Sequence, residues 1–441
     1  MANIAKLVSE TYALFHRNEF KYPIQGEENT RYMSLKETMW FAYKISGHPM
    51  EHGEKGKNIE EYFANQDLSF KMPEGFKEES KMVVTAGGDL LASRHINAKN
   101  AEHFWDDAEE FFFNSDVCCA NLETPVVPSR PPAYVPKTLL KTFPLNNAEE
   151  MFDVFHRGGK GINLFTTANN HALDMGPEGV GLTLDFIDKS DCLHVGTSRS
   201  FEERDNFPVI EKDGLRTAFI SFTYALNKSV LPEGEEYLAN YQRLNLPGAD
   251  LSLLKKQIKQ ARNEKNADVV VACLHFSTEF DSYPLQTTID MAHRIMEMGV
   301  DVIIGNHAHT VQPIEKYRYT DPFSGKKKEG LIVYALGDIV TPVEWEGMIN
   351  SRLNNLIRVE ISKGNIDGET VSLVSGLQIR PMYVYAAVEN DKCSDFRLLN
   401  LFKLMNDIEK SPVSLTEKDK REVKRLGTLA SKLLSKEIAS L

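Results

Sequence analysis

The feature that most constrains this chain is an apolar run at residues 302–304 that two histidines follow within five positions. A Val-Ile-Ile run predicts a short buried strand. Gly305 is expected to let the backbone turn sharply, and alternate residues of an extended segment point the same way, so His307 and His309 are expected to face one centre. Neutral imidazole is a good ligand for zinc, manganese, iron or nickel. The spacing is typical of a metal site, and two solvated loop histidines remain an equally good interpretation of the pair alone.

The same arrangement, a buried strand followed by a polar residue, recurs along the middle of the chain and alternates with amphipathic helices. This alternation predicts an α/β fold. The expected strands are residues 82–85, 117–120, 163–166, 269–274 and 331–336. In open α/β sheets a ligand lies outside the carboxyl ends of the strands, so polar residues far apart in the sequence are expected to converge there. The candidates are Asp89, Glu123, Asn170, His171, His275, His307 and His309.

These candidates form a mixed oxygen and nitrogen ligand set that suits one or two divalent metal ions. Each residue taken singly has an ordinary structural explanation. Asp89 can cap a turn or a helix, Asn170 can form a turn, and His275 can be a hydrogen-bonded core histidine. Since every member follows an apolar strand, the set as a whole favours a shared site.

The N-terminal part of the chain differs in character from the middle. Ser34 and Glu37 form a capping-box pattern ahead of an apolar helical face, and residues 59–64 carry a second helical pattern. No chemical motif is found before residue 81. We therefore predict an N-terminal helical extension over residues 1–80 that packs on the main domain.

The C-terminal part is also expected to be helical. A helix is predicted from about residue 394 to 410, and another from Ser414 with Glu417 completing its capping box. The final stretch is rich in Lys, Glu and Leu, which is typical of a solvated amphipathic helix. The predicted organisation is thus a main domain over residues 81–390 followed by a C-terminal helical segment over residues 391–441.

Composition narrows the partners and the compartment. The formal net charge is −12 and there is no long basic run, so a nucleic-acid partner is not expected. Five cysteines without metal-type spacing, including adjacent Cys118 and Cys119 in an apolar context, indicate buried free thiols in a reducing compartment. Residues 1–17 lack the apolar core of a signal peptide, and no window approaches the roughly 18 apolar residues of a spanning helix. A soluble, cytoplasmic protein with no membrane span is expected, and the oligomeric state stays open.

Six ordered segments resemble the capsule synthesis or poly-gamma-glutamate biosynthesis family called CapA, which is itself similar to the calcineurin-like metallophosphoesterases. The segments are Gly-Asp-Leu-Leu-Ala-Ser-Arg at 88–94, Asn-Leu-Glu-Thr-Pro at 121–125, Ala-Asn-Asn-His-Ala-Leu-Asp at 168–174, His-Phe-Ser-Thr-Glu at 275–279, Gly-Asn-His-Ala-His at 305–309 with Gln-Pro-Ile at 312–314, and Tyr-Ala-Leu-Gly-Asp at 334–338. They span roughly residues 82–342. The resemblance implies a layered α/β sandwich with mixed β-sheets, flanked by the N- and C-terminal helical extensions that it does not cover.

The resemblance also implies a role for each candidate residue. One or two divalent ions, of manganese, iron or zinc, would be bound by Asp89 and His309 at the first position, by Glu123 as a bridge, and by Asn170, His275 and His307 at the second position. His171 would protonate the leaving oxygen as a general acid. Arg94 and Glu279 would orient an anionic substrate or the metal ligands.

The sequence departs from the metallophosphoesterase pattern at several positions. Leu91 occupies the histidine position of the first Asp-x-His motif, as is usual in the capsule family, so one ligand of the first metal is absent. The aromatic residue and the glycine that usually follow the fourth-motif histidine are Phe276 and Ser277 in this chain, and Asp338 stands where asparagine is common. The membrane anchor usual in capsule proteins is not found either, which weakens the case for a role in the cell envelope.

Three functions remain open at this point. The first is a metal-dependent hydrolase of a phosphoester or a related anionic bond, linked to capsule or poly-gamma-glutamate biosynthesis; a bound cation would activate water and neutralise charge that develops on the substrate. The second is a non-catalytic accessory protein that binds an anionic polymer such as poly-gamma-glutamate. The third is an eroded site in which only the fold is kept. The retained Asn170, His171 and His-x-His pair favour the first function, and Leu91 favours the second.

Overall fold

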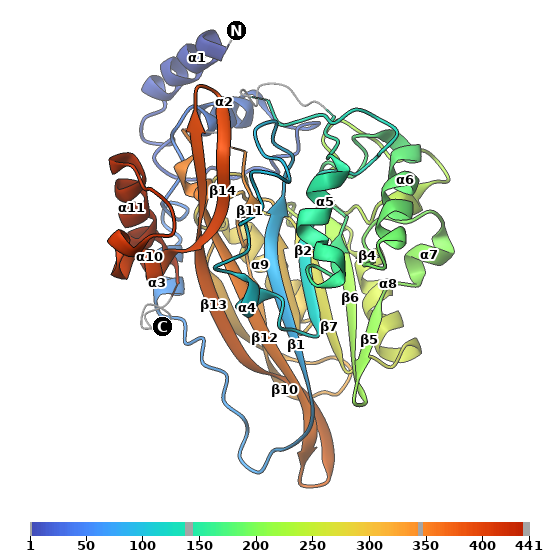
Figure 1. The fold of residues 1–441 in the computed structure, drawn as a ribbon. Helices are drawn as coiled ribbons and strands as arrows, with labels where there is room; N and C mark the ends of the chain where they lie inside the picture. Colours follow the sequence, from blue (N-terminus) through green and yellow to red (C-terminus); the bar gives the residue numbers. More distant parts are fainter. Residues whose placement is uncertain (1, 137–143, 343–346, 435–441) are drawn as a thin grey trace.

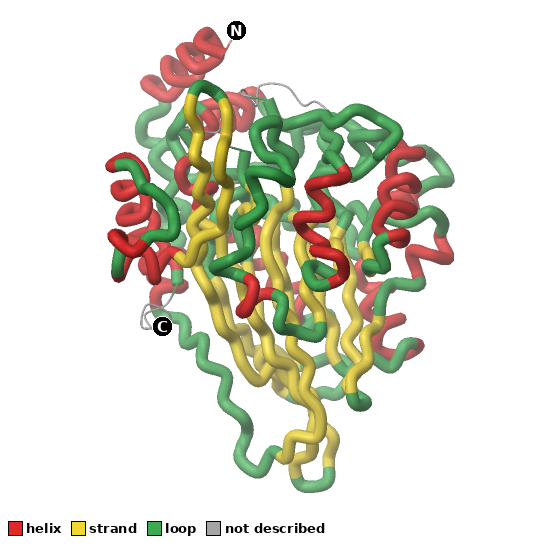
Figure 2. The backbone as a smooth tube through the Cα atoms, in the orientation of Figure 1, coloured by secondary structure: helices red, strands yellow, loops and turns green. Residues whose placement is uncertain are grey.

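The computed structural model describes residues 2–136, 144–342 and 347–434. Within these ranges two mixed β-sheets are covered by helices, as Figures 1 and 2 show. The first sheet contains, in spatial order, β14 (Lys392–Asn400), β13 (Glu369–Glu389), β12 (Leu353–Ile366), β1 (Lys77–Leu90), β2 (Val117–Asn121), β3 (Leu164–Thr166) and β4 (Leu193–Val195), with β11 (Asp338–Val340) beside the end of β1. The second contains β5 (Val209–Lys212), β6 (Leu215–Thr223), β7 (Val269–His275), β8 (Val302–Asn306), β10 (Lys327–Val333) and β9 (Ile314–Thr320).

Each sheet combines a parallel part with an antiparallel part. In the first sheet β1 to β4 are parallel, while β12, β13 and β14 form an antiparallel meander on the other side of β1. In the second sheet β6, β7, β8 and β10 are parallel, and β5 and β9 close the two edges as antiparallel strands. The layered α/β sandwich with mixed sheets predicted from the sequence is therefore confirmed.

Side chains alternate between two hydrophobic cores, as the pleat of a strand requires. On β2, Val117 and Cys119 belong to the core that also contains β6, β7 and β8, whereas Cys118 and Ala120 belong to the core beneath the helices of the opposite face. Both faces of the strand are thus buried, which explains why it appears in the sequence as a continuous apolar run. Cys118 and Cys119 are buried free thiols, as predicted.

The helices fall into two covering layers and two terminal groups. Among the described residues, the α-helices are α1 (Ala2–Phe15), α2 (Leu35–Ile45), α3 (Ile59–Ala64), α4 (Glu109–Phe112), α5 (Glu149–His156), α6 (Gly176–Lys189), α7 (Phe201–Asp205), α8 (Ser252–Lys259), α9 (Gln286–Met296), α10 (Leu401–Asn406) and α11 (Glu417–Leu433). Helices α4, α5 and α6 pack on the outer face of the first sheet, and α8 and α9 pack on the second. None of the described helices is long and apolar enough to cross a bilayer.

The helices predicted in the N-terminal part of the chain are present in the structure. The capping box of Ser34 and Glu37 is formed at the start of α2, and α3 occupies the residues expected for it. The strand expected at residues 82–85 is part of the longer β1, so Asp89 lies within a strand instead of after it. The strand expected at residues 331–336 ends earlier, at Val333.

The helix predicted from residue 394 is wrong over its first part, because residues 392–400 form β14 and pair with β13. Phe396 and Leu398 are fully buried, whereas Asp395 and Arg397 are partly exposed, and this period of two indicates a strand. The final helix begins at Glu417, with Thr416 and Asp419 as its capping box in place of Ser414 and Glu417. Since β14 belongs to the first sheet, the helical C-terminal segment starts at about residue 401, while the division of the chain into three parts stays a prediction.

Candidate metal centre

Strand pairing places one predicted site residue of each sheet opposite an asparagine of the neighbouring strand. In the first sheet Asp89 of β1 stands opposite Asn121 of β2, and in the second His275 of β7 stands opposite Asn306 of β8. The parallel strands that carry these residues end at the same side of the molecule, which is the upper side in Figure 1. The loops that follow β2, β3, β7 and β8 therefore start from one rim, as expected for a site at the carboxyl ends of the strands.

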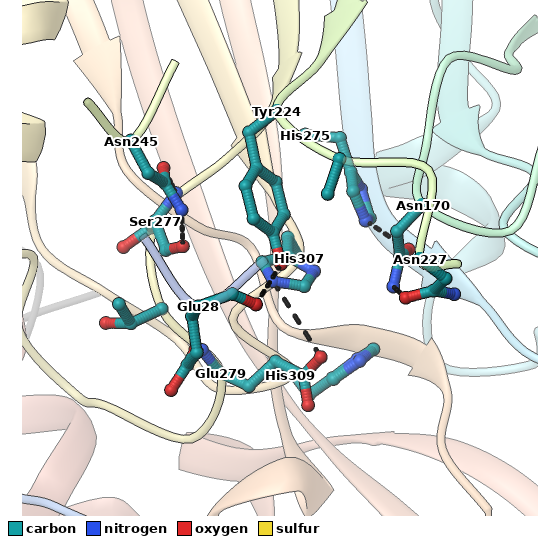
Figure 3. A network of polar contacts seen from close by, with 12 residues as sticks. Glu28, Asn170, Tyr224, Asn227, Asn245, His275, Ser277, Glu279, His307 and His309 are labelled. Atoms are coloured by element: carbon teal, nitrogen blue, oxygen red, sulfur yellow. Dashed lines mark hydrogen bonds and ion pairs between the residues drawn. The ribbon is translucent and has the colours of Figure 1, made fainter. Parts of the chain in front are cut away.

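Six side chains from these strands and loops converge in one cluster. Their ligand atoms form overlapping groups of three, and within each group the atoms lie within 4.8 Å of one another. The groups are Glu123 with His275 and His307, Glu279 with His307 and His309, and Asp89 with Glu123 and His309. Figure 3 shows His275, His307, His309 and Glu279 turned toward a common region.

Asn170 joins the cluster through His275, since its Oδ1 atom lies 2.9 Å from the His275 Nε2 atom. Every residue that the sequence nominated as a metal ligand is thus near at least one other. Glu279, nominated only to orient ligands or substrate, supplies a carboxylate to the cluster itself, 3.8 Å from His307 Nε2. The roles of individual residues stay predictions.

The cluster has more buried polar atoms than it can satisfy. Both carboxylate oxygens of Glu123 and both ring nitrogens of His307 are buried without a hydrogen-bond partner among the described residues. Unpaired buried polar atoms cost free energy and are rare in folded proteins. A divalent cation would give these atoms a partner, and oxygen with imidazole nitrogen is a donor set that zinc, manganese and iron accept. The residues present therefore fit a metal ion.

Burial shifts the pKa values of the cluster in the direction that neutralises it. Burial raises the pKa of Asp89 to about 7 and raises the pKa of Glu123 well above its ordinary range. Burial also lowers the pKa of His275 and of His307 well below the usual value. Without a cation, burial favours the protonated form of these carboxyl groups and the neutral form of these imidazoles, so metal binding would compete with protons for the carboxyl groups.

His309 behaves differently from the other two histidines. Burial opposes its protonation, but the carboxylates of Asp338 and Glu123 outweigh burial and raise the pKa of His309 well above the usual value. Its Nδ1 atom lies 2.9 Å from the Asp338 carboxylate, while its Nε2 atom lies 3.9 Å from Glu123. A carboxylate that holds one nitrogen of a histidine fixes the direction of the other, which is how metal-binding histidines are commonly oriented.

Asp89 is also held in place by neighbours. Asn121 donates its side-chain amide to Asp89 Oδ1 over 2.7 Å, and the backbone amide of His307 donates to Asp89 Oδ2 over 3.0 Å. Sequence reasoning missed Asn121 and Asp338 as site residues. Both directly end or follow a predicted apolar strand, so the rule that selected the other candidates would have found them.

The backbone around the two histidines is not extended, contrary to the prediction from their spacing. His307 has a φ of +100° and His309 a φ of +53°, in the region that non-glycine residues seldom adopt. Gly305 lies within β8 and does not make the turn; a side chain there would place its Cβ atom 2.1 Å from the Tyr334 carbonyl oxygen. Close packing therefore demands this glycine, and the left-handed residues after it turn the imidazoles inward.

His171 lies at the partly exposed edge of the cluster. It directly follows Asn170, whose Oδ1 atom lies 2.9 Å from the His275 Nε2 atom. Its Nδ1 atom lies 2.6 Å from Asp174 Oδ2, and the same oxygen accepts the backbone amide of Leu145 over 2.8 Å. Asp174 was not among the predicted site residues, although it lies in the segment that carries the resemblance.

Arg94 and Leu91 are not among the residues of the groups of ligand atoms described above. The Arg94 guanidinium is 40% exposed and donates to His95 and, over 3.3 Å, to Asp391 in the turn between β13 and β14. Leu91 is buried in a small apolar group with Val135 and Leu145. The position at which metallophosphoesterases carry a histidine is therefore filled by apolar packing.

The fold and the cluster together define a layered α/β protein with a buried carboxylate and histidine centre at its strand ends. The chain belongs to the family of the bacterial capsule synthesis protein PGA_cap, which it matches over residues 83–343. This match covers the six segments that carry the resemblance noted in the sequence, and confirms it.

Individual relatives agree with this family assignment. The chain is 27% identical over 290 residues to the capsule biosynthesis protein CapA of Bacillus anthracis, which covers 64% of this chain and 65% of that protein. It is 28% identical over 274 residues to the PGA biosynthesis protein CapA of Bacillus subtilis strain 168, covering 60% of this chain and 65% of that protein. The matches thus extend over slightly less than two thirds of the length of these relatives.

Two further comparisons are more distant. A probable polyglutamine synthesis accessory protein of Mycobacterium tuberculosis is 24% identical over 188 residues, which is 41% of this chain and 45% of that protein. Among solved structures, the calcineurin-like phosphoesterase YfkN from Bacillus subtilis aligns with a TM-score of 0.35 and 13% identity, covering 80% of this chain and 98% of that chain.

Proposed function

We propose that this protein is a metal-dependent hydrolase of a phosphoester or a related anionic bond, linked to capsule or poly-gamma-glutamate biosynthesis. The observation that carries the proposal is the set of buried ligand atoms on Glu123 and His307 that have no hydrogen-bond partner among the described residues, together with the His171–Asp174 pair. A structural carboxylate or histidine would have its hydrogen bonds satisfied within the protein. Atoms left unpaired together, next to a proton donor, are what a catalytic metal centre requires.

The residues divide into ligands and a proton donor. Asp89, Glu123, Asn170, His275, His307 and His309 would hold one or two divalent ions of manganese, iron or zinc, with Glu279 as a further carboxylate. A cation bound there would supply an activated water and neutralise negative charge that develops on the substrate. An anionic small molecule or polymer is the substrate that such a site favours.

His171 would deliver the proton that the leaving oxygen needs. Asp174 accepts from its Nδ1 atom, which fixes the ring and directs Nε2 away from that carboxylate. A positioned imidazole of this kind typically contributes about 100- to 10,000-fold to turnover. Because His171 is partly exposed while the ligands are buried, a substrate reaches this side of the cluster first.

A second function has its own support. Leu91 fills the position of a metal-binding histidine with an apolar side chain that packs on Val135 and Leu145, so the first metal position has fewer ligands than in the metallophosphoesterases. A site of this kind would serve a non-catalytic accessory protein that binds an anionic polymer such as poly-gamma-glutamate. The word accessory in the name of the mycobacterial relative agrees with such a role.

One experiment separates the two functions. The metal content of the purified protein would be measured, and the metal would be located by anomalous diffraction. The protein would then be assayed for turnover of bis(p-nitrophenyl) phosphate and of p-nitrophenyl phosphate, and in parallel for binding of poly-gamma-glutamate. Metal-dependent turnover that His171→Ala abolishes while metal content stays constant supports the hydrolase. Polymer binding of equal strength in wild type and His171→Ala, without turnover, supports the accessory role. Absence of any bound divalent ion at the cluster would contradict both metal-based proposals.

A further inference from the structure

The loop that follows β7 holds Glu279 in an unusual backbone conformation. Ser277 and Phe280, on either side of Glu279, have φ angles of +82° and +61°, although neither is glycine. Such conformations persist only where surrounding contacts determine them. The contacts that hold this loop therefore determine where the Glu279 carboxylate lies.

Asn245, Ala308 and Gln312 hold part of this loop, and the contacts to Glu279 itself come from the N-terminal part of the chain. The backbone amide of Glu279 donates to the carboxylate of Glu28, and the ammonium group of Lys44 donates to the Glu279 carbonyl oxygen over 2.6 Å. Both backbone polar groups of Glu279 are thus occupied by residues more than 230 positions earlier in the sequence. Figure 3 shows Glu28 directly beside Glu279 and Tyr224.

A third N-terminal residue extends the same contact along the loop. The backbone amide of Met50 donates to the carbonyl of Phe280 over 3.1 Å, and Ser282 donates its amide to the carbonyl of Met50 over 2.7 Å. Met50 and Asp281 form a parallel bridge, so residue 50 pairs with the loop as a strand would. The loop is therefore tied to the N-terminal part at several consecutive residues.

The charged side chains of Glu28, Lys44 and Asp281, where the N-terminal part meets the loop, are buried and in contact with one another. Lys44 is fully buried, and its Nζ atom lies 2.7 Å from the Glu28 carboxylate and 3.2 Å from that of Asp281. One cation between two carboxylates in the protein interior is costly to assemble and strongly destabilising to break. Apolar packing would hold a loop without this cost, so the arrangement points to a need for exact placement.

The contact between the N-terminal part of the chain and the loop after β7 is also linked to the metal-ligand cluster through Tyr224. The hydroxyl of Tyr224 donates to the Glu28 carbonyl over 3.2 Å, and the Tyr224 ring lies 4.6 Å from the His307 ring. Glu28 itself has a φ of +53°, so its backbone is constrained as well. Glu28 is thus linked to His307 through Tyr224 and to Glu279 through a direct hydrogen bond.

We propose that Glu28 and Lys44 are positioning residues of the metal centre, which hold the backbone of Glu279 from both sides so that its carboxylate meets His307. This inference builds on the proposed metal-dependent function. It gives the N-terminal part of the chain a role in metal binding, whereas the sequence suggested only a covering extension. Neither Glu28 nor Lys44 belongs to the groups of possible ligand atoms, and each acts through Glu279.

Glu28→Gln is the sharpest variant because it keeps the shape and removes one acceptor. The Glu28 carboxylate accepts from Lys44 with Oε1 and from the Glu279 amide with Oε2. A glutamine has one side-chain oxygen, so it satisfies one of these two donors and presents an NH₂ group to the other. Lys44→Met would instead leave two buried carboxylates unpaired, so its effect on folding would obscure the test.

Glu27→Gln is the matched control. Glu27 is adjacent to Glu28 and buried, but its carboxylate accepts from Arg243 and not from Lys44 or the Glu279 amide. Three measurements would be made on the full chain of wild type and both variants: the melting temperature, Mn²⁺ affinity by calorimetry after removal of bound metal, and hydrogen exchange of the peptide that covers residues 276–283.

We expect Glu28→Gln to weaken Mn²⁺ binding by about 10- to 100-fold, the usual effect of losing a group that orients a ligand, and to speed exchange in the loop. Glu27→Gln should leave both unchanged. Mn²⁺ affinity and loop exchange equal to wild type in Glu28→Gln would overturn the proposal. If wild type itself binds no Mn²⁺, Zn²⁺ or Fe²⁺, the metal-dependent function fails. Loop exchange then decides the positioning role, which stands if Glu28→Gln alone speeds exchange and is rejected otherwise.

Discussion

Two buried carboxylates, each next to a histidine, have opposite surroundings in this protein. Glu315 accepts hydrogen bonds from Tyr62 and His293 at one oxygen, the latter over 2.8 Å, and from Tyr334 over 2.7 Å at the other. Glu123 is equally buried, yet neither of its oxygens has a hydrogen-bond partner among the described residues. The Glu315 group is complete within the fold, whereas the Glu123 cluster needs something from outside it.

The difference shows why residue type alone does not identify a site. Both groups contain acid, imidazole and tyrosine side chains, and both are formed by residues far apart in the sequence. What separates them is whether the buried polar atoms are satisfied by the chain itself. Each of the following predictions tests this distinction by pairing a change at the cluster with a change at Glu315 or His293.

The largest effect is expected for the two histidines that lie beside these groups. His171→Ala should lower turnover of a phosphodiester substrate by about 100- to 10,000-fold, because it removes the proton donor, while metal content stays near wild type. His293→Ala should leave turnover unchanged, since His293 only completes the Glu315 group. Steady-state kinetics and elemental analysis on the same preparations check this. Equal turnover of His171→Ala and wild type would remove the catalytic role of His171.

The next effect concerns the two carboxylates that accept from a histidine. Asp338→Asn should weaken Mn²⁺ binding by about 10- to 100-fold, because the carboxylate that orients the His309 ring is lost. Glu315→Gln makes the same chemical change beside His293 and should leave Mn²⁺ affinity unaltered. Calorimetric titration of both variants gives the comparison. Similar affinity losses in the two would show that the effect is general destabilisation.

A third effect concerns the stability of the metal-free protein, and it is expected at the Glu315 group alone. Glu315→Gln should lower the free energy of unfolding by about 1–3 kcal/mol, because at least one buried donor loses its acceptor. Glu123→Gln should not lower the stability of the metal-free protein, since Glu123 has no hydrogen bond to lose, but it should reduce the gain in melting temperature on adding Mn²⁺. Urea unfolding with and without Mn²⁺ measures both. A large loss of metal-free stability in Glu123→Gln would mean that its oxygens have partners.

Many of the site residues could be predicted from the sequence because the pattern that marks them is local. A polar residue directly after an apolar run marks a strand end, and parallel strands place such ends at one rim. His275, His307 and Glu123 were found in this way, and the cluster contains them. The same reasoning, applied without exception, would have included Asp338 and Asn121.

Other features depend on contacts that no local pattern records. The pairing of Glu28 and Lys44 with the loop at Glu279 joins segments more than 230 residues apart, and either residue alone is typical of a solvated surface. The positive φ of His307 and the close approach of Gly305 to the Tyr334 carbonyl are features that a period of two does not reveal. At β14, Phe396 and Leu398 alternate with Asp395 and Arg397, which signals a strand, although a helix is predicted here from the sequence.

The smallest effect is a pH dependence that metal should reverse. Burial raises the pKa of Asp89 to about 7, above the roughly 3.9 of an unfolded chain, and also raises the pKa of Glu123. Between these values the folded protein binds more protons than the unfolded one, so its free energy of unfolding falls as pH rises. The raised pKa of His309 acts in the same direction.

His275 and His307 oppose this trend only below about pH 6.5, because their lowered pKa values make both neutral in the folded protein. From pH 6.5 to 8 the metal-free protein should therefore melt at progressively lower temperature. With saturating Mn²⁺ the slope should flatten or reverse, since metal binding needs the carboxyl groups deprotonated and strengthens as pH rises. Thermal melts in chelator and in Mn²⁺ at four pH values test this, with Glu315→Gln as a control that should keep the wild-type slopes. Parallel curves with and without Mn²⁺ would mean that metal binding does not draw protons from this cluster, and that the ion lies elsewhere in the protein.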